Sequence, residues 1–352
     1  MQKPFTATAL AVTLAAGAWM ADPASAMCFP VPEEGRVLTS LGQLNLILFD
    51  RAANQVKMIP NLRFNGNSED FALVVPTPAL PTLQAEAPEL WREAETLTLP
   101  ITTRSDFDLD NPLSCSETDY EPAPNPTESF DVIIHTTTQV GGMIATVLSS
   151  DNADALVTWL NTHGYHVSLD LTTRIAPYVE RDWYFTAMRP DSSDSGNQMP
   201  PEGWDSNVDP VSFTWTGSTF ELPLEILDIS HGSSLPVVAY VVDDHRVSIG
   251  RFDTHYANRI NAGELREIRA QYPNLGALLS EGRFLTRLAH SFGRNDAMTG
   301  TLPIIRARAD DEFRLTRRGG LWFAGDLGLL VLAGLSTLLD GLRRRRRAQG
   351  AR

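Results

Sequence analysis

Four acidic residues near the middle of the chain have the spacing of a calcium-binding loop. Positions 1, 3, 5 and 12 of an EF-hand loop, whose carboxylates chelate the ion, would be filled by Asp106, Asp108, Asp110 and Glu117. The residues before Asp106 do not follow a helical pattern, however, and Asn111 stands where that loop needs a glycine. An acidic surface loop is the better interpretation, and we expect no metal site here.

Two histidines close together in the sequence are the next candidates for metal binding. His163 and His166 belong to the segment HGYH, but Gly164 ends a predicted helix between them, so the two rings need not share a face. The sequence offers no third ligand beside them, and surface or strand-edge positions explain both. Asp243-Asp244-His245 falls between two predicted strands, where a turn accounts for it.

The sequence contains none of the short motifs that mark common catalytic centres. It has no G-x-S-x-G nucleophile elbow, no H-E-x-x-H zinc motif and no glycine-rich phosphate loop. A site assembled from scattered serine, histidine and acidic residues leaves no such motif, because geometry in the folded chain defines it. The catalytic residues, if there are any, are therefore unknown at this point, and no cofactor is predicted.

Two cysteines, Cys28 and Cys115, follow the N-terminal leader described below. In an oxidising compartment an isolated pair is most simply a disulfide. It would close a long loop and stabilise the fold by about 4 kcal/mol in the chain-entropy description. Reactive thiols and a two-sulfur metal site are the alternatives, but the first has no support in the sequence and the second lacks a nearby third ligand.

The N-terminal segment has the order of features found in secretory signal peptides. Lys3 supplies positive charge, an apolar run extends to about Met20, and Ala24-Ser25-Ala26 forms a small-residue cleavage site. This order predicts a signal peptide over residues 1–26, a mature start at Met27 and an exported protein. An uncleaved anchor is the alternative, although the run is short and rich in alanine for a membrane span.

Near the C-terminus, the apolar stretch Leu321–Leu339 precedes the five arginines of Arg343–Arg347. Its 19 residues would form a helix of about 28 Å, close to the hydrocarbon thickness of about 30 Å. We expect a transmembrane helix over 319–342 and a basic tail over 343–352 on the cytoplasmic side, since positive charge stays in the cytoplasm. A helix packed on a soluble body is one alternative. A sorting signal cut near Gly319-Gly320 is the other.

The part expected outside the membrane, residues 27–318, is long enough for one large or two small domains. The formal net charge of the chain is −14, and the tail contributes arginines, so the remainder is more acidic than the total. An acidic body disfavours nucleic acid and anionic lipid as ligands of this part. The expected location is a bacterial cell membrane, with the body in the periplasm or outside the cell.

Hydrophobic patterning predicts an α+β body of mixed strands, mainly hairpins, with a few packed helices. A hairpin is expected over 43–65 and a strand buried on both faces over 70–76. Further strands are expected at 130–138, 143–149, 183–188, 211–215, 220–229, 235–242 and 246–249. Helices are expected at 86–97, 151–163 with Asp151 as N-cap, 171–180, 262–271 and 275–289. Residues 190–210 have the composition of a linker.

Several of these segments together resemble the DUF2330 family of exported bacterial proteins. They are the hairpin followed by DFALVVP, the later TWLNTHGY, and the strand containing DWYFTAM, with NPLSC similar to the family's cysteine segment. The opening MCFP departs from the cysteine-glycine-aromatic start common among relatives. The resemblance implies an exported, often membrane-tethered protein and implies no particular chemistry.

We therefore expect a non-enzymatic module, anchored in the membrane, that binds or scaffolds another envelope component. The alternative is an envelope hydrolase whose site is assembled from scattered residues. A cleft that gathers a histidine with Ser, Asp or Glu would favour the hydrolase. An exposed apolar patch or an open strand edge would favour the binding module.

Overall fold

The computed structural model describes residues 28–32, 38–66, 71–102, 131–165, 167, 170–191, 210–228 and 234–317. Several sequence predictions fall outside these ranges: the signal peptide over 1–26, the acidic segment 106–117, Cys115, His166, most of the linker, the transmembrane helix over 319–342 and the basic tail. Within the described part, no helix is both long and apolar enough to cross a membrane.

The predicted α+β class is wrong, because the described chain is mostly sheet. Strands account for 48% of it and helices for 22%. The error is concentrated at 275–289, where the sequence predicts one long helix. The chain instead forms a short helix, α6 (Pro273–Leu278), and then a ten-residue strand, β15 (Phe284–Gly293). Pairing of β15 with strands on both of its sides overrides the helix propensity of its Leu, Arg and Ala residues.

The largest sheet has eight strands in the order β17-β14-β15-β12-β2-β3-β10-β5. Its centre is the predicted hairpin, β2 (Leu38–Asp50) and β3 (Gln55–Gly66), whose turn ends at Asn54 with φ 50°. β2 pairs in parallel with β12 (Ser234–Asp243), and every other pairing in this sheet is antiparallel. The remaining strands are β5 (Thr82–Ala85), β10 (Val211–Thr216), β14 (Asp253–Arg259) and β17 (Phe313–Arg314).

A close backbone approach accompanies the parallel pairing of β2 with β12. Gly42 in β2 has φ 152°, and a Cβ atom there would lie 3.0 Å from both the Cγ and the carbonyl oxygen of Pro236. Only glycine accepts this combination of dihedral angle and proximity without a shift of one strand. The register between the two strands is therefore built around Gly42.

A second sheet has five strands in the order β1-β4-β9-β8-β7, all antiparallel. Its strands are β1 (Phe29–Pro32), β4 (Phe71–Thr77), β7 (Val132–Val140), β8 (Met143–Ser150) and β9 (Tyr184–Pro190). Every residue of β4 is buried, as its continuous apolar run predicts for a strand covered on both faces. β7 lies at the edge of the sheet and is mostly exposed.

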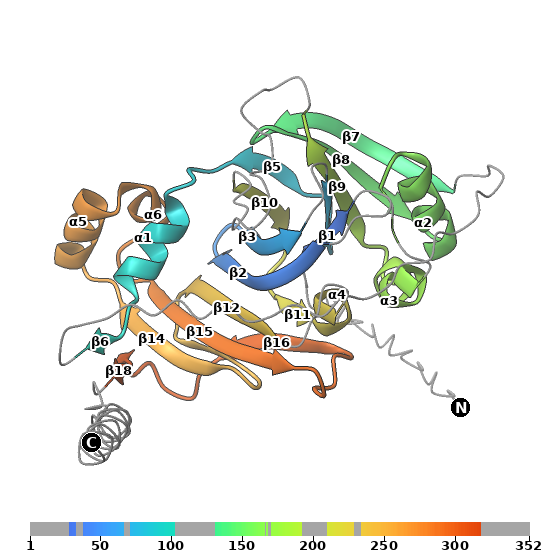
Figure 1. The fold of residues 1–352 in the computed structure, drawn as a ribbon. Helices are drawn as coiled ribbons and strands as arrows, with labels where there is room; N and C mark the ends of the chain where they lie inside the picture. The colour runs from blue at the N-terminus through green and yellow to red at the C-terminus, as the bar shows by residue number, and fades with distance from the viewer. Residues whose placement is uncertain are drawn as a thin grey trace, which may run out of the picture. The chain divides into compact units, whose positions relative to one another are not determined.

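Two hydrophobic cores hold these layers together. One core joins the two sheets and takes side chains such as Ile47 and Phe213 from the larger sheet and Val75 and Phe185 from the smaller one. The other core lies on the opposite side of the large sheet, against α6, α1 (Leu90–Leu97) and α5 (Ala262–Gln271). Figure 1 shows these three helices grouped at one end of the sheet.

The other helices and strands complete the same unit of the chain. α2 (Ala153–Thr162) lies against β7 and β8, and α3 (Asp170–Val179) follows it. The predicted strand over 220–229 is instead β11 (Glu221–Pro223) followed by α4 (Leu224–Asp228). β11 belongs to a three-stranded sheet with β16 (Thr301–Arg306) and β13 (Val247–Ile249). A separate small unit contains the parallel pair β6 (Ile101–Thr102) and β18 (Thr316–Arg317).

The helix predicted over 151–163 is present as α2, but its cap is Asn152 and not Asp151. The Asn152 side chain accepts hydrogen bonds from the backbone N–H groups of Asp154 at 2.8 Å and Ala155 at 3.1 Å. These donors belong to the first turn, where a helix has no partners of its own for its N–H groups. The capping oxygen therefore comes one residue later in the chain than expected.

Replacing this cap by alanine tests the assignment. Asn152→Ala should lower the free energy of unfolding by about 1 kcal/mol, because two N–H groups lose their acceptor. Asp151→Ala is the matched control and should change it by less than about 0.5 kcal/mol. Urea unfolding followed by circular dichroism measures both, and an equal loss for the two variants would contradict the assignment.

Candidate functional site: the exposed strand β7

The strand β7 leaves one of its edges without a partner strand in the described part of the chain. It pairs with β8 on one side only, and it ends the order of the five-stranded sheet. Seven consecutive residues, from Ile133 to Gln139, are exposed. Exposure of neighbouring residues on both faces is unusual, since a half-buried strand alternates between inside and outside. An edge of this kind offers backbone N–H and C=O groups to another chain.

Two large apolar side chains stand out on this strand. Ile133 is 61% exposed and Ile134 is 53% exposed. Because successive side chains of a strand point to opposite faces, the pair presents apolar surface on both sides of the edge. Ile134 lies directly opposite Leu148 of β8, which is fully buried, so the change from core to surface occurs between these two strands.

A β-bulge brings a histidine on β7 to a serine on β8. The register of the two strands shifts between Ile134 and Thr136, which makes His135 the extra residue. His135 Nε2 lies 2.8 Å from Ser149 Oγ, and the imidazole ring lies 5.0 Å from the ring of Tyr184 on β9. A serine–histidine hydrogen bond is the core of a nucleophile–base pair. Sequence patterns give no signal for it, because a bulge cannot be read from spacing.

A cavity of 410 Å³ opens beside this pair, at the ends of three strands of the sheet. Ile133, Ser149 and Tyr184 lie in one row across β7, β8 and β9, and all three line the cavity. The other lining residues are Val132, Ser150 and three exposed aspartates, Asp131, Asp151 and Asp182. The cavity is therefore partly apolar and carries negative charge.

The site meets both criteria stated from the sequence: a histidine, a serine and aspartates adjoin one cavity, and the strand edge beside them is open. A catalytic serine–histidine pair needs a third group that orients the imidazole. In the described ranges, no carboxylate accepts a hydrogen bond from His135. An open edge with adjoining apolar side chains, by contrast, is sufficient for strand addition.

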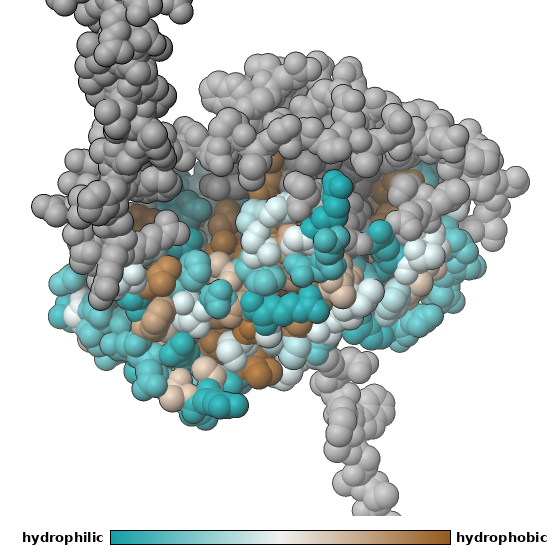
Figure 2. Space-filling view, turned by 60° about the horizontal axis from the view of Figure 1, so that its bottom comes forward, coloured by the Kyte–Doolittle hydropathy of each residue, from teal (hydrophilic) through white to brown (hydrophobic). Residues whose placement is uncertain are grey.

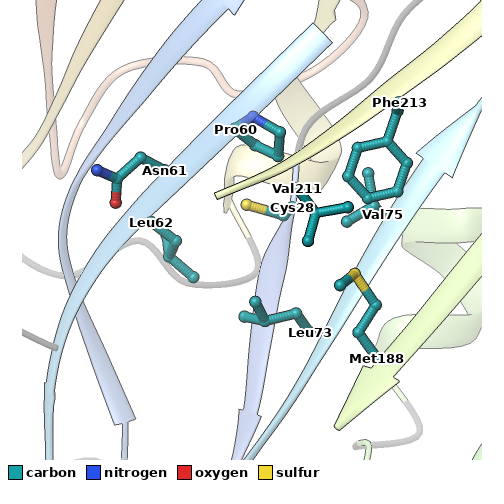
Figure 3. A pocket seen from close by; sticks show the side chains of 9 residues that line it. All are labelled: Cys28, Pro60, Asn61, Leu62, Leu73, Val75, Met188, Val211 and Phe213. Carbon is teal, nitrogen blue, oxygen red and sulfur yellow. The ribbon is translucent and has the colours of Figure 1, made fainter. Parts of the chain in front are cut away.

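Cys28 lies at a different place, in an apolar pocket between the two sheets. Figure 3 shows its thiol among Leu62, Leu73, Val211 and Met188. The pocket holds about 30 Å³, roughly the room for one water molecule. Burial raises the pKa of the thiol to about 12, which keeps it protonated and unreactive as a free thiol. The pairing with Cys115 stays a prediction.

The face turned forward in Figure 2 shows how hydrophilic and hydrophobic residues are distributed over one side of the molecule. Its described residues are mostly hydrophilic, with hydrophobic residues in small groups between them. Over the described surface as a whole, scattered exposed apolar residues such as Ile305 and Phe313 are normal for a protein. They carry no indication of a site by themselves.

Comparison with known proteins identifies a family. Residues 22–304 match the family described as an uncharacterized protein conserved in bacteria, DUF2330, over more than half of the chain. The chain belongs to the DUF2330 family. The resemblance predicted from its sequence segments is thereby confirmed. None of the curated proteins matches the chain.

One solved structure is weakly similar to this DUF2330 protein. It is a mutated baculovirus P35 after caspase cleavage, with 8% sequence identity and a TM-score of 0.28, covering 77% of this chain and 98% of that chain. A TM-score this low carries no inference about fold or function.

His163, one of the residues singled out from the sequence of this DUF2330 protein, packs against helix α2. Its ring stacks on Trp159 with centroids 3.9 Å apart, and its Nδ1 lies 2.8 Å from the Trp159 carbonyl oxygen. The histidine thus covers the end of α2. In the described part of the chain, no three Cys, His, Asp or Glu side chains come together as a metal site would require.

The segment Asp243-Asp244-His245 forms the predicted turn between β12 and β13, and arginines secure it. Arg51, beside the β2–β3 turn, donates from Nε to Asp243 at 2.9 Å. Arg283 forms an ion pair with Asp244 at 3.0 Å. The charged residues that suggested chemistry in the sequence therefore connect distant segments of the DUF2330 fold.

His245 belongs to the same network through Asp310. Asp310 accepts hydrogen bonds from His245 Nδ1 at 2.7 Å, Arg259 Nη2 at 2.8 Å and the backbone N–H of Arg246 at 3.1 Å. The hydrogen bond from His245 is the main cause that lowers the pKa of Asp310 below its ordinary 3.8, with help from Arg246 and Arg259. The carboxylate holds the segment after β16 to the turn.

The lowered pKa of Asp310 gives a pH-dependent prediction. A carboxyl group that is more acidic in the folded chain stabilises the fold above its unfolded pKa, and loses that effect as pH falls through its folded pKa. Wild type should therefore be more stable than Asp310→Asn at pH 6, and the difference should shrink below pH 3.8. Urea unfolding at several pH values measures it. A difference between wild type and Asp310→Asn that stays constant over this pH range would contradict the assignment.

Proposed function

We propose that this DUF2330 protein is a binding module of the bacterial envelope that captures an extended segment of another polypeptide on β7. The single observation that carries the proposal is the edge of β7, exposed over seven consecutive residues. A strand added there would complete the hydrogen bonding of β7 and cover Ile133 and Ile134. No chemical step is required of the protein in this role.

The envelope location is part of the proposal and rests on the sequence. It is supported by the leader-like order of residues 1–26 and by the apolar stretch before Arg343–Arg347. Both segments lie beyond the described ranges. An exported body with an exposed strand edge is suited to partners that are extended when they reach the envelope, such as unfolded or linker segments of other proteins.

A photo-crosslinker on β7 tests the proposed function in growing cells. Benzoylphenylalanine in place of Ile134 should give a defined adduct whose peptide map lies in one continuous segment of the partner. The same group in place of Ile305 on β16, which is similarly exposed at 55%, should not give this adduct. Equal adducts from both positions, or none from Ile134, would argue against capture on β7.

A positive charge on the edge of β7 should weaken binding of the partner. Ile134→Lys places a charged side chain where the partner's apolar surface must lie, and lysine is a common means of blocking strand edges. Loss of the crosslink from a second position on β7, such as Gln139, is the expected result. Ile305→Lys serves as the control for a general effect of added charge. A yield that is unchanged by Ile134→Lys contradicts the role of the edge.

The second candidate function is hydrolysis, because His135 and Ser149 are hydrogen-bonded beside a cavity. In this role Ser149 Oγ would attack a carbonyl carbon while His135 Nε2 takes its proton and passes it to the leaving group. Water would then release the acyl group from Ser149 by the same route. The pair lacks an orienting carboxylate in the described part of the chain, so hydrolysis ranks second.

A fluorophosphonate probe decides between the two functions, since it reacts with activated serines and releases fluoride. Under the binding function, wild type should remain unlabelled at Ser149. Labelling that disappears in Ser149→Ala and in His135→Ala, but persists in the control Ser291→Ala, would establish the hydrolase instead. Mass spectrometry of the labelled peptide identifies the modified residue.

A further inference from the structure

The cavity at the end of β7 also bears on what kind of segment the strand can hold. We infer that the captured segment carries a lysine or arginine whose side chain enters the cavity formed with Asp131, Asp151 and Asp182. This inference rests on the proposed function and adds the charge of the partner to it. Four observations support it.

The first is the position of the cavity relative to the open edge. Ile133, Ser149 and Tyr184 occupy one row across three strands and line the cavity. A strand added to β7 would lie about 4.8 Å away and would extend this row by one residue. A long side chain at that point lies on the same face as Ser149 and can reach across Ile133 into the cavity.

The second observation is that the negative charge is not neutralised locally. Asp131, Asp151 and Asp182 are exposed, and none of them forms an ion pair with another described residue. Arg181, which precedes Asp182 in the chain, has its guanidinium over the rings of Tyr178 and Trp183 and donates from Nε to the Pro177 carbonyl. Like charges around one cavity favour a cationic ligand and disfavour an anionic one.

The third observation concerns the polar groups in the cavity. The Ser150 hydroxyl is committed to the carbonyl oxygens of Asp131 and Asn152 at 2.9 and 2.8 Å. Ser149 is engaged with His135. The aspartates do not converge into a metal-binding group with other described residues. A flexible organic cation, which can address separate carboxylates, fits this arrangement better than a bare metal ion.

The fourth observation argues against the simplest alternative occupant, a second copy of β7. Its sequence, VIIHTTTQV, contains no lysine or arginine. Pairing of two β7 strands would therefore cover the edge and leave both acidic cavities without a cation. A basic extended segment of another protein satisfies the backbone edge, the apolar pair and the charge together.

Selection from a library of random dodecapeptides tests the inference while the natural partner is unidentified. Purified full-length protein is used for selection, and Ile134→Lys defines which peptides depend on β7. These peptides should be enriched in Lys or Arg next to a β-forming apolar run. Their Kd should rise about tenfold or more in the triple variant D131N/D151N/D182N, as expected when several charge contacts are removed. It should stay unchanged in the control D253N/E267Q/E281Q, which removes equal charge elsewhere.

The outcomes separate this inference from the proposed function. Peptides that depend on β7 but show no basic enrichment, and bind the triple variant equally well, overturn the cationic partner and leave strand capture intact. Absence of any peptide dependent on β7 overturns both. Self-association of the protein that is abolished by Ile134→Lys, with no peptide selected, identifies a second copy as the occupant and overturns the inference.

Discussion

The fold depends on one pairing, the parallel alignment of β2 with β12. Residues 43–48 of the N-terminal hairpin meet residues 237–242 in the middle of the eight-stranded sheet. β12 carries β15 and β14 on its other side, so this pairing joins the two halves of the chain. The contact is fully buried at Leu46 and Val241, which face the two different cores. Separation of these strands would open both cores at once.

The same architecture explains why β7 contributes little to the stability of the fold. The strands at the centre of each sheet are covered on both faces, whereas β7 contributes little to either core. An exposed apolar edge favours non-native association, and soluble proteins usually protect such edges with charge, proline, a β-bulge or a covering element. The bulge at His135 is a device of this kind on β7. The fold gains little stability from the exposed side chains of Ile133 and Ile134, which is consistent with the capture of a partner strand proposed above.

Local patterns in the sequence are sufficient to predict several elements of the fold. The hairpin β2–β3, the buried strand β4 and the helix α2 follow from alternation, composition and a helix end, although the cap of α2 is displaced by one residue. β15 could not be predicted, because its ten residues resemble a helix until two neighbouring strands pair with them. The strand β7 is predicted, yet its exposure depends on sheet order. The contact of His135 with Ser149 depends on a bulge, which no pattern in the sequence reports.

The ion pair of Arg51 with Asp243 joins residues that are 192 positions apart in the chain. A polypeptide that emerges with its N-terminus first therefore completes the β2–β3 hairpin long before β12 is available to it. Contacts this distant in sequence form slowly, because a long loop must close before they are made. Until then, the edge of β2 that pairs with β12 remains open, and the growing chain stays incompletely folded. The order of the strands thus delays completion of the fold until after most of the chain has been made.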